Sequence, residues 1–404
     1  MKKSLLLGLV VVGCLSASDF SEAFTGGKSS GEIRIGSINQ NNTAGVDTYG
    51  TSLGGWLKYE TGAWNDVTIG MAAYVSQKFS LLSGEGEEVT TDFFDANGNS
   101  FVYIGEAYVD YSVSDLTLRI GRQRIETPFV NGDDVRMLPN TFEAAVGTYS
   151  GIEKTTITAG YLYRWAGFDS PQGHHEHINQ FNQFGRNHDS NGVIMLGVVN
   201  ESIENVVIQG WLYRTDKVTN IAYTDANYKL NFDEANGVEF LAQYALLDEN
   251  TNSLGDKTGM DGKVDGAAIN LHCGLYRAGI AYNRVLNSEG KVAVDGLGGG
   301  PYYTSMEEMT IDGIEDVKAY QLRGEVEMNG VGIQGLNIAA AYGVFKSRSV
   351  DVNVRELDII ALYEMNDAII IDASYAKIED RNNNFDSGKN GGYSRFLVRL
   401  NYTF

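Results

Sequence analysis

Apolar and polar side chains alternate along much of this chain, and the alternation is clearest over residues 393–404. Every second side chain there is apolar or aromatic: Phe396, Val398, Leu400, Tyr402 and Phe404. Because successive strand side chains point to opposite faces, Arg395, Arg399, Asn401 and Thr403 share the other face. One face therefore suits lipid and the other suits water. A strand of this kind that ends on an aromatic residue is typical of the closing strand of an outer-membrane barrel.

The same alternation predicts about eighteen strands, and no stretch beyond the amino-terminal segment has a convincing helical period. The expected ranges are 30–38, 48–60, 65–77, 101–113, 115–124, 142–150, 154–166, 191–201, 204–215, 217–230, 236–247, 264–274, 276–286, 317–328, 335–346, 354–364, 367–378 and 391–404. The pattern predicts an all-β fold, a transmembrane up-and-down antiparallel barrel.

The connections between these strands alternate in length. Long segments are expected at 39–47, 78–100, 125–141, 167–190, 248–263, 287–316 and 379–390, and tight turns at 61–64, 114, 151–153, 202–203, 329–332 and 365–367. The short link near 216 and the looser one at 231–235 fit this pattern least well. Long external loops opposite short periplasmic turns are what a barrel with both termini in the periplasm requires.

The amino-terminal segment has the layout of a secretory signal peptide. Two lysines precede an apolar run at 5–12, and small residues continue to Ser18. We expect residues 1–18 to be the signal peptide, with cleavage after Ala17 or Ser18, and 19–404 to form a single barrel domain. A lipoprotein acylation site at Cys14 is the alternative. Cys273 is the only other cysteine and is expected to face outward without chemistry.

Composition supports a barrel with a polar lumen. The 404 residues include 48 Gly, 23 Tyr and 17 Phe but only 4 Pro, and the mean hydropathy is −0.20. A barrel exposes only alternate residues to lipid, so a slightly negative average is compatible with membrane insertion. The net charge of −21 argues against binding nucleic acid or anionic lipid through a basic surface. Eighteen strands would enclose a water-filled lumen, so the default function is a pore.

The third external loop carries the most distinctive pattern. Segment 121–142 begins Gly-Arg-Gln, continues through Thr-Pro to an Asp-Asp-Val-Arg-Met core, and ends Pro-Asn-Thr-Phe. The residues in this pattern are Thr127, Pro128, Asp133, Asp134, Arg136, Met137, Pro139, Asn140, Thr141 and Phe142. The segment closely resembles the third-loop signature of the OprD-type outer-membrane porins. The glycine-rich segment 296–313 resembles the seventh loop of the same family.

This resemblance implies an eighteen-stranded channel, monomeric or trimeric, whose third loop folds into the lumen with help from the seventh. Family members pass small hydrophilic solutes, often amino acids or other carboxylates, along a ladder of basic side chains. A guanidinium row offers successive carboxylate sites that differ little in energy, so a solute is held without being trapped.

Alternation predicts a comparable basic strip on the lumenal face of this chain. Its expected members are Arg34, Lys58, Arg119, Arg164, Arg323, Arg395 and Arg399. Acidic residues are expected to face the same water: Glu32, Glu106, Asp110, Glu325, Glu327, Glu356, Asp358 and Asp372. The basic residues either bind solutes or only solvate the wall. Opposed rows of both signs would order dipolar solutes, and this mixture puts anion preference in doubt.

Within the third loop, Glu126, Asp133, Asp134 and Arg136 are the candidates for the narrowest point. For the two aspartates, the alternative is to pin the loop by accepting hydrogen bonds from backbone amides. Arg136 is expected to line the pore, either alone or while also forming an ion pair with a wall carboxylate.

Other chemistry is weakly supported by the sequence. His174, His175, Glu176, His177 and His188 lie close together in one polar loop, but we predict no metal site there and no cofactor elsewhere. An enzyme is not expected, because an outer-membrane phospholipase needs a serine beside a histidine, and His272 is the only strand histidine.

The sequence therefore predicts an outer-membrane porin for passive diffusion of ions, amino acids or small carboxylates, weakly selective with a slight preference for cations. The alternative is a barrel-anchored surface protein that acts in adhesion or envelope structure. Expected partners are small solutes, outer-membrane lipid and, during insertion, the outer-membrane assembly machinery. The expected oligomeric state is a monomer or homotrimer.

Overall fold

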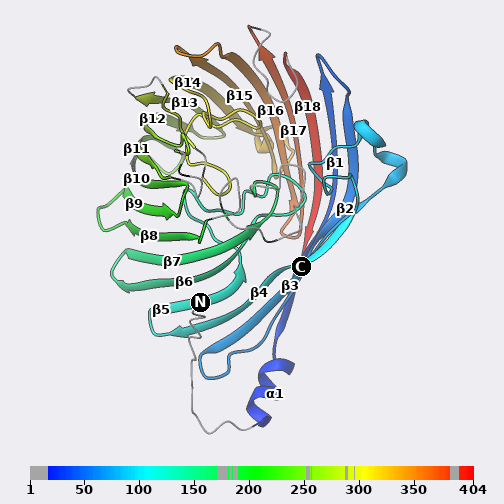
Figure 1. The fold of residues 1–404 in the computed structure, drawn as a ribbon, viewed down its shortest axis with the longest axis vertical. Coiled ribbons are helices and arrows are strands. Elements are labelled where there is room, and N and C mark those ends of the chain that lie inside the picture. Colours follow the sequence, from blue (N-terminus) through cyan, green and yellow to red (C-terminus); the bar gives the residue numbers. More distant parts are fainter. Residues whose placement is uncertain are drawn as a thin grey trace.

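The computed structural model describes residues 17–170, 181, 184, 190–251, 255, 257–286, 290–294, 296–382 and 391–404. Eighteen antiparallel strands form one closed sheet in the order of the chain, because β1 pairs with both β2 and β18. Figure 1 shows the strands arranged around a central space. Within the described residues, every helix is too short or too polar to cross a bilayer.

The strands agree closely with the predicted ranges. They are Lys28–Asn42 (β1), Thr48–Glu60 (β2), Val67–Lys78 (β3), Phe101–Val113 (β4), Leu116–Gln123 (β5), Thr141–Ile152 (β6), Thr155–Ala166 (β7), Val193–Asn200 (β8), Val206–Thr215 (β9), Thr219–Asn231 (β10), Asn236–Glu249 (β11), Gly262–Cys273 (β12), Tyr276–Leu286 (β13), Val317–Glu327 (β14), Leu336–Ser347 (β15), Asn353–Asn366 (β16), Ile369–Asp380 (β17) and Tyr393–Thr403 (β18). The links around 216 and 232–235 are short, and neighbouring strands remain antiparallel across both of them.

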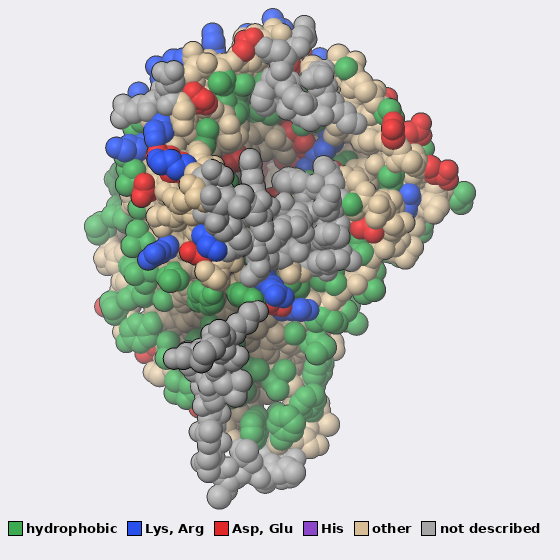
Figure 2. Space-filling view, viewed as in Figure 1, with side chains coloured by type: hydrophobic (Ala, Val, Ile, Leu, Met, Phe, Trp, Pro, Cys, Tyr) green, Lys and Arg blue, Asp and Glu red, His purple; other side chains and the backbone are tan. Residues whose placement is uncertain are grey.

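The closing strand separates its two faces as predicted. Phe396 is 48% exposed and Phe404 51% exposed on the outer face. On the other face, Leu397 is buried, and Arg395 and Arg399 contact the loops. Hydrophobic side chains also cover much of the outer surface in Figure 2. The outer face is therefore apolar, as contact with lipid requires, whereas the inner face combines polar groups with buried apolar residues.

A short α-helix was not predicted. α1 spans Ala17–Thr25 and lies beyond the barrel end that carries the short turns (Figure 1). Phe20 and Phe24 are one turn apart on it and pack edge to face at 5.1 Å. Phe20 also packs against Trp64 in the turn between β2 and β3, at 5.3 Å. The expectation of no helix was wrong here because tertiary packing stabilises a helix too short to show a clear period.

Candidate pore constriction

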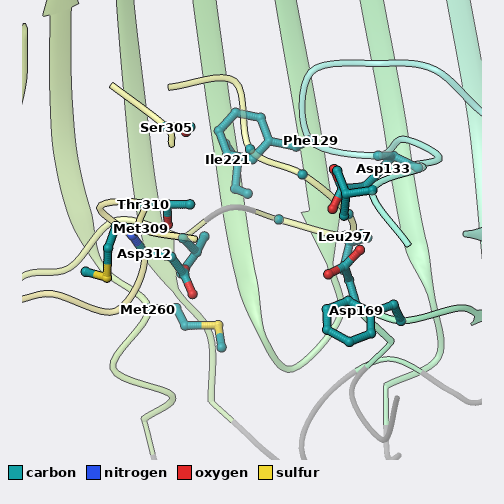
Figure 3. Close-up of a pocket in the computed structure, with 18 of the residues that line it drawn as sticks. Phe129, Asp133, Asp169, Ile221, Met260, Leu297, Ser305, Met309, Thr310 and Asp312 are labelled. Carbon is teal, nitrogen blue, oxygen red and sulfur yellow. Dashed lines mark hydrogen bonds between the residues drawn. The ribbon is translucent and has the colours of Figure 1, made fainter. Parts of the chain in front are cut away.

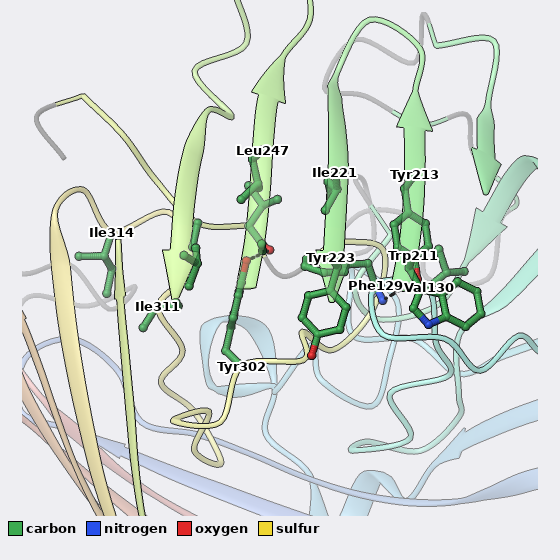
Figure 4. Close-up of a cluster of buried hydrophobic side chains, with 14 of the residues drawn as sticks. Phe129, Val130, Trp211, Tyr213, Ile221, Tyr223, Leu247, Tyr302, Ile311 and Ile314 are labelled. Atoms are coloured by element: carbon green, nitrogen blue, oxygen red, sulfur yellow. Dashed lines mark hydrogen bonds between the residues drawn. The ribbon is translucent and has the colours of Figure 1, made fainter. Parts of the chain in front are cut away.

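The third loop, residues 124–140, begins at the end of β5 and contacts the far side of the strand ring. Phe129 is 1% exposed and packs edge to face against Tyr213, Tyr223 and Tyr302, at ring distances of 5.7, 5.4 and 6.0 Å (Figure 4). Tyr213 lies on β9 and Tyr223 on β10. The tip of the loop is therefore fixed to β9 and β10 by aromatic packing.

The seventh loop, residues 287–316, runs beside the third and supports it. Val130 and Leu297 form a parallel bridge, and the amide of Leu297 donates to the carbonyl of Phe129 at 2.7 Å. Gly296 and Gly298 have positive φ angles of 92° and 132°. A Cβ on either glycine would lie 2.6 Å from a third-loop carbonyl oxygen. The glycines therefore allow the two backbones to approach closely.

At the barrel seam, two wall arginines bind the descending half of the third loop. Arg34 donates to both carboxylate oxygens of Asp134, at 2.6 and 3.0 Å. Arg399 donates to the carbonyls of Asp134 and Arg136, at 2.8 and 2.9 Å. Burial opposes ionisation of Asp134, but the hydrogen bonds from Arg34 lower its pKa below the usual value. The loop therefore partly neutralises Arg34, whereas Arg399 contacts carbonyls of the loop and pairs with Asp372 on β17 at 2.7 Å.

Four charged groups join three loops to β18. Arg136 lies 3.1 Å from Asp92 in the second loop, residues 79–100, and 3.4 Å from Glu308 in the seventh. Arg395 contacts the same two carboxylates at 3.0 and 2.6 Å. The Arg136 and Asp92 side chains are 9% and 8% exposed. Two arginines thus balance two carboxylates in a nearly buried cluster, and Arg136 has a structural contact besides any role in lining the pore.

Two aspartates approach one another where the third loop meets the fourth. Figure 3 shows Asp133 and Asp169 beside Leu297, and their carboxyl groups are hydrogen-bonded. Burial, together with the neighbouring Asp169, raises the pKa of Asp133 to about 7. Burial also raises the pKa of Asp169, whose carboxylate accepts from Asn140 at 2.7 Å. The pair therefore retains a proton near neutral pH.

Glu126 supports the backbone of the third loop. Its Oε1 accepts a hydrogen bond from the amide of Gly132 at 3.2 Å. Burial raises the pKa of Glu126. This contact gives Glu126 a pinning role within the loop.

A second charged group covers the wall from β2 to β4. Lys58 and Arg124 each lie 3.3 Å from the carboxylate of Glu106. Arg124 also donates to the hydroxyl of Tyr74 at 2.8 Å and stacks over the ring of Trp56 at 4.5 Å. The sequence prediction missed Arg124. Its place in the Gly-Arg-Gln-Arg start of the loop signature was the available signal.

The remaining predicted basic residues lie in different settings. Arg119 pairs with Asp110 and stacks over Tyr108 at 4.0 Å. Arg323 is exposed and donates to Asn270 at 2.6 Å. The Arg119 pair joins the adjacent strands β4 and β5, whereas the contact of Arg323 with Asn270 runs from β14 to β12 across Gly279 of β13.

Arg164 is a correction to the predicted lumenal strip. A β-bulge shifts the register between β6 and β7, so that Glu143 lies opposite Arg164 and Ala144 opposite Leu162. Arg164 therefore lies with Glu143 on the face opposite to that of buried Leu162, which points inward. One extra residue reverses the alternation on which the prediction depended.

Several predicted wall carboxylates bind the loops or neighbouring basic groups. Glu356 and Asp358 on β16 accept hydrogen bonds from backbone amides of residues 307–309, at 2.8 to 3.1 Å. The other pairs are Glu32 with Arg34, Asp372 with Arg399, and Glu325 and Glu327 with Arg277. Asp92 and Glu308 were missed by the prediction, because strand alternation gives no information about loop geometry. Arg277 was also missed, although it lies on β13 and alternates with the buried Asn283 and Val285, so its period was the available signal.

The wall at β10 and β11 has a different charge pattern. The carboxylate of Asp225 accepts hydrogen bonds from Gln209 and Tyr223, each at 2.8 Å. Glu239 accepts from Asn227 and Asn270, at 2.6 and 2.8 Å, with Lys229 at 3.7 Å. Neutral groups therefore supply most of the hydrogen bonds to these two carboxylates.

The two loops border a cavity of about 890 Å³. Its walls include Phe129, Asp133 and Arg136 from the third loop and Glu308 and Met309 from the seventh (Figure 3). The lining combines apolar surface with charged groups, which suits a small polar solute.

The sequence model of the outer membrane porins, OprD family, matches residues 56–368. This chain belongs to the OprD family of outer-membrane porins. It is therefore an integral β-barrel channel of the bacterial outer membrane, and this family favours the channel over the surface-anchor alternative. No curated protein sequence matches the chain.

Solved structures of Pseudomonas aeruginosa proteins share this fold. OpdL is 17% identical with a TM-score of 0.75, covering 94% of this chain and 99% of its own. OccK3 (OpdO) is 16% identical with a TM-score of 0.74, and the match covers 95% of this chain and 97% of OccK3. OpdK with vanillate is 15% identical with a TM-score of 0.75, and the match covers 94% of this chain and 99% of OpdK. The predicted His174, His175, Glu176, His177 and His188 group lies outside the described residues.

Proposed function

We propose that this porin passes small hydrophilic solutes by passive diffusion through a lumen narrowed by the third loop. The observation that carries the proposal is that this loop is fixed to β1 and β18 through Arg34 and Arg399, and to β9 and β10 through Phe129. Because β1 and β10 lie on opposite sides of an eighteen-strand ring, a loop held at both must cross the interior or its mouth. Glu126, Asp133, Asp134 and Arg136 then border the constriction.

Charge pairing supports weak selectivity with a slight cation preference. Five basic residues of the expected strip have a carboxylate within 4 Å: Arg34, Lys58, Arg119, Arg395 and Arg399. A paired guanidinium attracts a passing anion less than a free one. Asp225 on the far wall is hydrogen-bonded to neutral groups and retains its negative field.

Ions, amino acids and small carboxylates are the proposed solutes. The exposed Arg323, whose hydrogen-bond partner is the neutral Asn270, supplies a contact for a carboxylate. The fold relative OpdK, solved with vanillate, suggests vanillate as a first organic probe.

Planar-bilayer recording tests the proposal. We expect discrete conductance steps and, under a potassium chloride gradient, a reversal potential displaced modestly toward that of potassium. A reversal potential displaced toward chloride would refute the cation preference. The absence of steps from correctly inserted barrels would refute an open channel.

We further infer that residues 1–18 are removed as a signal peptide and that the mature barrel, monomeric or homotrimeric, is inserted by the outer-membrane assembly machinery. The polar character of 19–25 and the contact of Phe20 with the periplasmic turn support a mature chain that begins near α1. Mass spectrometry of the protein from outer membranes tests this inference, since retention of residues 1–18 would contradict it.

A further inference from the structure

Basic side chains follow one another on the outer face of six consecutive strands, although the chain has a net charge of −21. This outer basic row consists of Lys263, Arg284, Lys318, Lys346, Arg355 and Lys377, one each on β12 to β17. Each is adjacent in sequence to a side chain that is at most 2% exposed: Val264, Val285, Val317, Phe345, Val354 and Ile378. Those neighbours point inward, so the basic residues point outward. All six lie near the strand ends that carry the long loops.

The register brings like charges together within this row. Arg284 is directly opposite Lys318, and Lys318 is directly opposite Lys346. Neighbouring strands are about 4.8 Å apart, and like charges placed directly opposite one another destabilise a sheet. A bound anion would relieve this repulsion.

The row keeps an excess of positive charge. Within the described residues, its carboxylate partners are Asp265, 2.8 Å from Arg284, and Glu379, 3.4 Å from Lys377. The Nε atom of Arg355 is buried and has no hydrogen-bond partner in the described part of the chain. Six cations thus face two carboxylates. In Figure 2, Lys and Arg side chains are frequent along the upper left margin, where Figure 1 places β12 to β14.

An apolar groove of about 450 Å³ begins directly beside the row on the membrane side. Its outward lining residues are Ala267, Ile269, Ile280, Tyr282, Tyr320, Leu322, Tyr342 and Val344. Because alternate residues share a face, Tyr282, Tyr320 and Val344 follow Arg284, Lys318 and Lys346 toward the membrane centre. The small side chain of Ala267 leaves the hollow between the larger ones. Cations and groove form one continuous surface.

We propose that this surface binds a phosphorylated glycolipid of the outer leaflet, with its phosphates on the outer basic row and one acyl chain in the groove. The row extends across six strands, about 24 Å, and so matches a headgroup with more than one phosphate better than a single phosphodiester. An acidic patch on a second copy of this chain would also complement the row, and a dimer that depends on the row would reveal this occupant. The site lies outside the lumen and is independent of the proposed solute path.

Native mass spectrometry of the detergent-purified barrel tests the proposal. The probe is a bisphosphorylated, hexa-acylated glucosamine disaccharide, compared with phosphatidylglycerol and phosphatidylethanolamine. We expect the double variant K318Q/K346Q to bind the glycolipid at least tenfold more weakly. The matched control is R214Q, because Arg214 is exposed, lies one residue before the end of β9 and is outside the row. Unchanged single-channel conductance would show that each variant is folded.

A second variant tests the groove. Ala267→Leu should fill the hollow and weaken binding of the hexa-acylated probe, while binding of the deacylated headgroup stays the same. The proposal is overturned if K318Q/K346Q binds as tightly as the wild type, if R214Q loses as much affinity, or if phosphatidylglycerol binds equally well. It is also overturned if the double variant instead loses a protein dimer, since the surface would then hold a second copy.

Discussion

At the scale of single residues, Arg136 is the most informative side chain of the proposed constriction. Its guanidinium lies between Asp92 and Glu308, both nearly buried. Truncation to alanine leaves one arginine, Arg395, to balance two carboxylates. Breaking a buried ion pair costs about 3 to 5 kcal/mol. We expect the loss of this ion pair to weaken docking of the third loop and not folding of the barrel. Arg136→Ala should therefore increase open-channel current noise in bilayer recordings while the barrel remains folded.

A compensating variant separates charge from packing. In Arg136→Ala with Glu308→Gln, one of the two carboxylates is neutral and Arg395 can balance the other. Current noise should then return toward the wild-type value. Quiet channels in the single variant would contradict the structural role of Arg136, and a change in mean conductance without added noise would assign it to pore lining alone.

The pair of Asp133 and Asp169 predicts a dependence on pH. The pKa of Asp133 is raised to about 7 by burial and by Asp169, from an ordinary value of 3.8. Protons are therefore bound preferentially in the docked state, and this contribution to docking is complete below about pH 4 and is lost as the pH rises through 7. Current noise should increase between pH 6 and pH 8. The increase should be absent in Asp133→Asn, and noise that falls with rising pH would contradict the assignment.

The seam illustrates what sequence could predict about individual residues. Alternation alone places Arg34, Arg395 and Arg399 on the inner face, because the strand period is two and the outer face is visibly apolar. It could not show that Asp92 and Glu308 meet them, since loop conformation depends on contacts between distant segments. Most members of the predicted basic strip are consequently paired with carboxylates.

At the scale of structural elements, the contact between the third and seventh loops depends on glycine. Gly298 has a φ of 132°, and a Cβ there would lie 2.6 Å from the carbonyl oxygen of Asn131. Gly298→Ala should therefore separate the loops and make the third loop more accessible to added protease. Gly313→Ala is the matched control, because Gly313 also has a positive φ, 65°, but its Cβ would meet no atom within 4 Å. Equal cleavage of the two variants would show that backbone strain, not steric contact, is decisive.

The elements were more predictable than their irregularities. Strand positions follow from periodicity that repeats over 8 to 15 residues, whereas one bulge in β7 was enough to turn Arg164 to the other face. The nine-residue helix α1 was not predicted from the sequence, because its stability comes from the packing of Phe20 on the turn between β2 and β3. Local departures of this kind carry little periodic signal.

At the scale of the whole molecule, net charge and channel selectivity need not follow one another. Outward and loop charges contribute to the total of −21 but are screened from a permeating ion beyond about 8 Å at physiological salt. Charges on the inner wall act at closer range. The slight cation preference should therefore depend on wall carboxylates such as Asp225, whose hydrogen-bond partners are neutral.

Two substitutions with the same change in total charge distinguish these contributions. Asp225→Asn removes a charge from the inner wall, and Asp248→Asn removes one from an exposed position beside the inward Leu247. A unit charge about 8 Å from a permeating ion in water contributes about 0.5 kcal/mol before screening and about 0.2 kcal/mol after it, with opposite signs for a cation and an anion. Asp225→Asn should therefore lower the cation-to-anion permeability ratio about twofold. Asp248→Asn should leave the ratio unchanged. Reversal potentials in a potassium chloride gradient measure both ratios, and equal shifts would mean that total charge sets the selectivity of this porin.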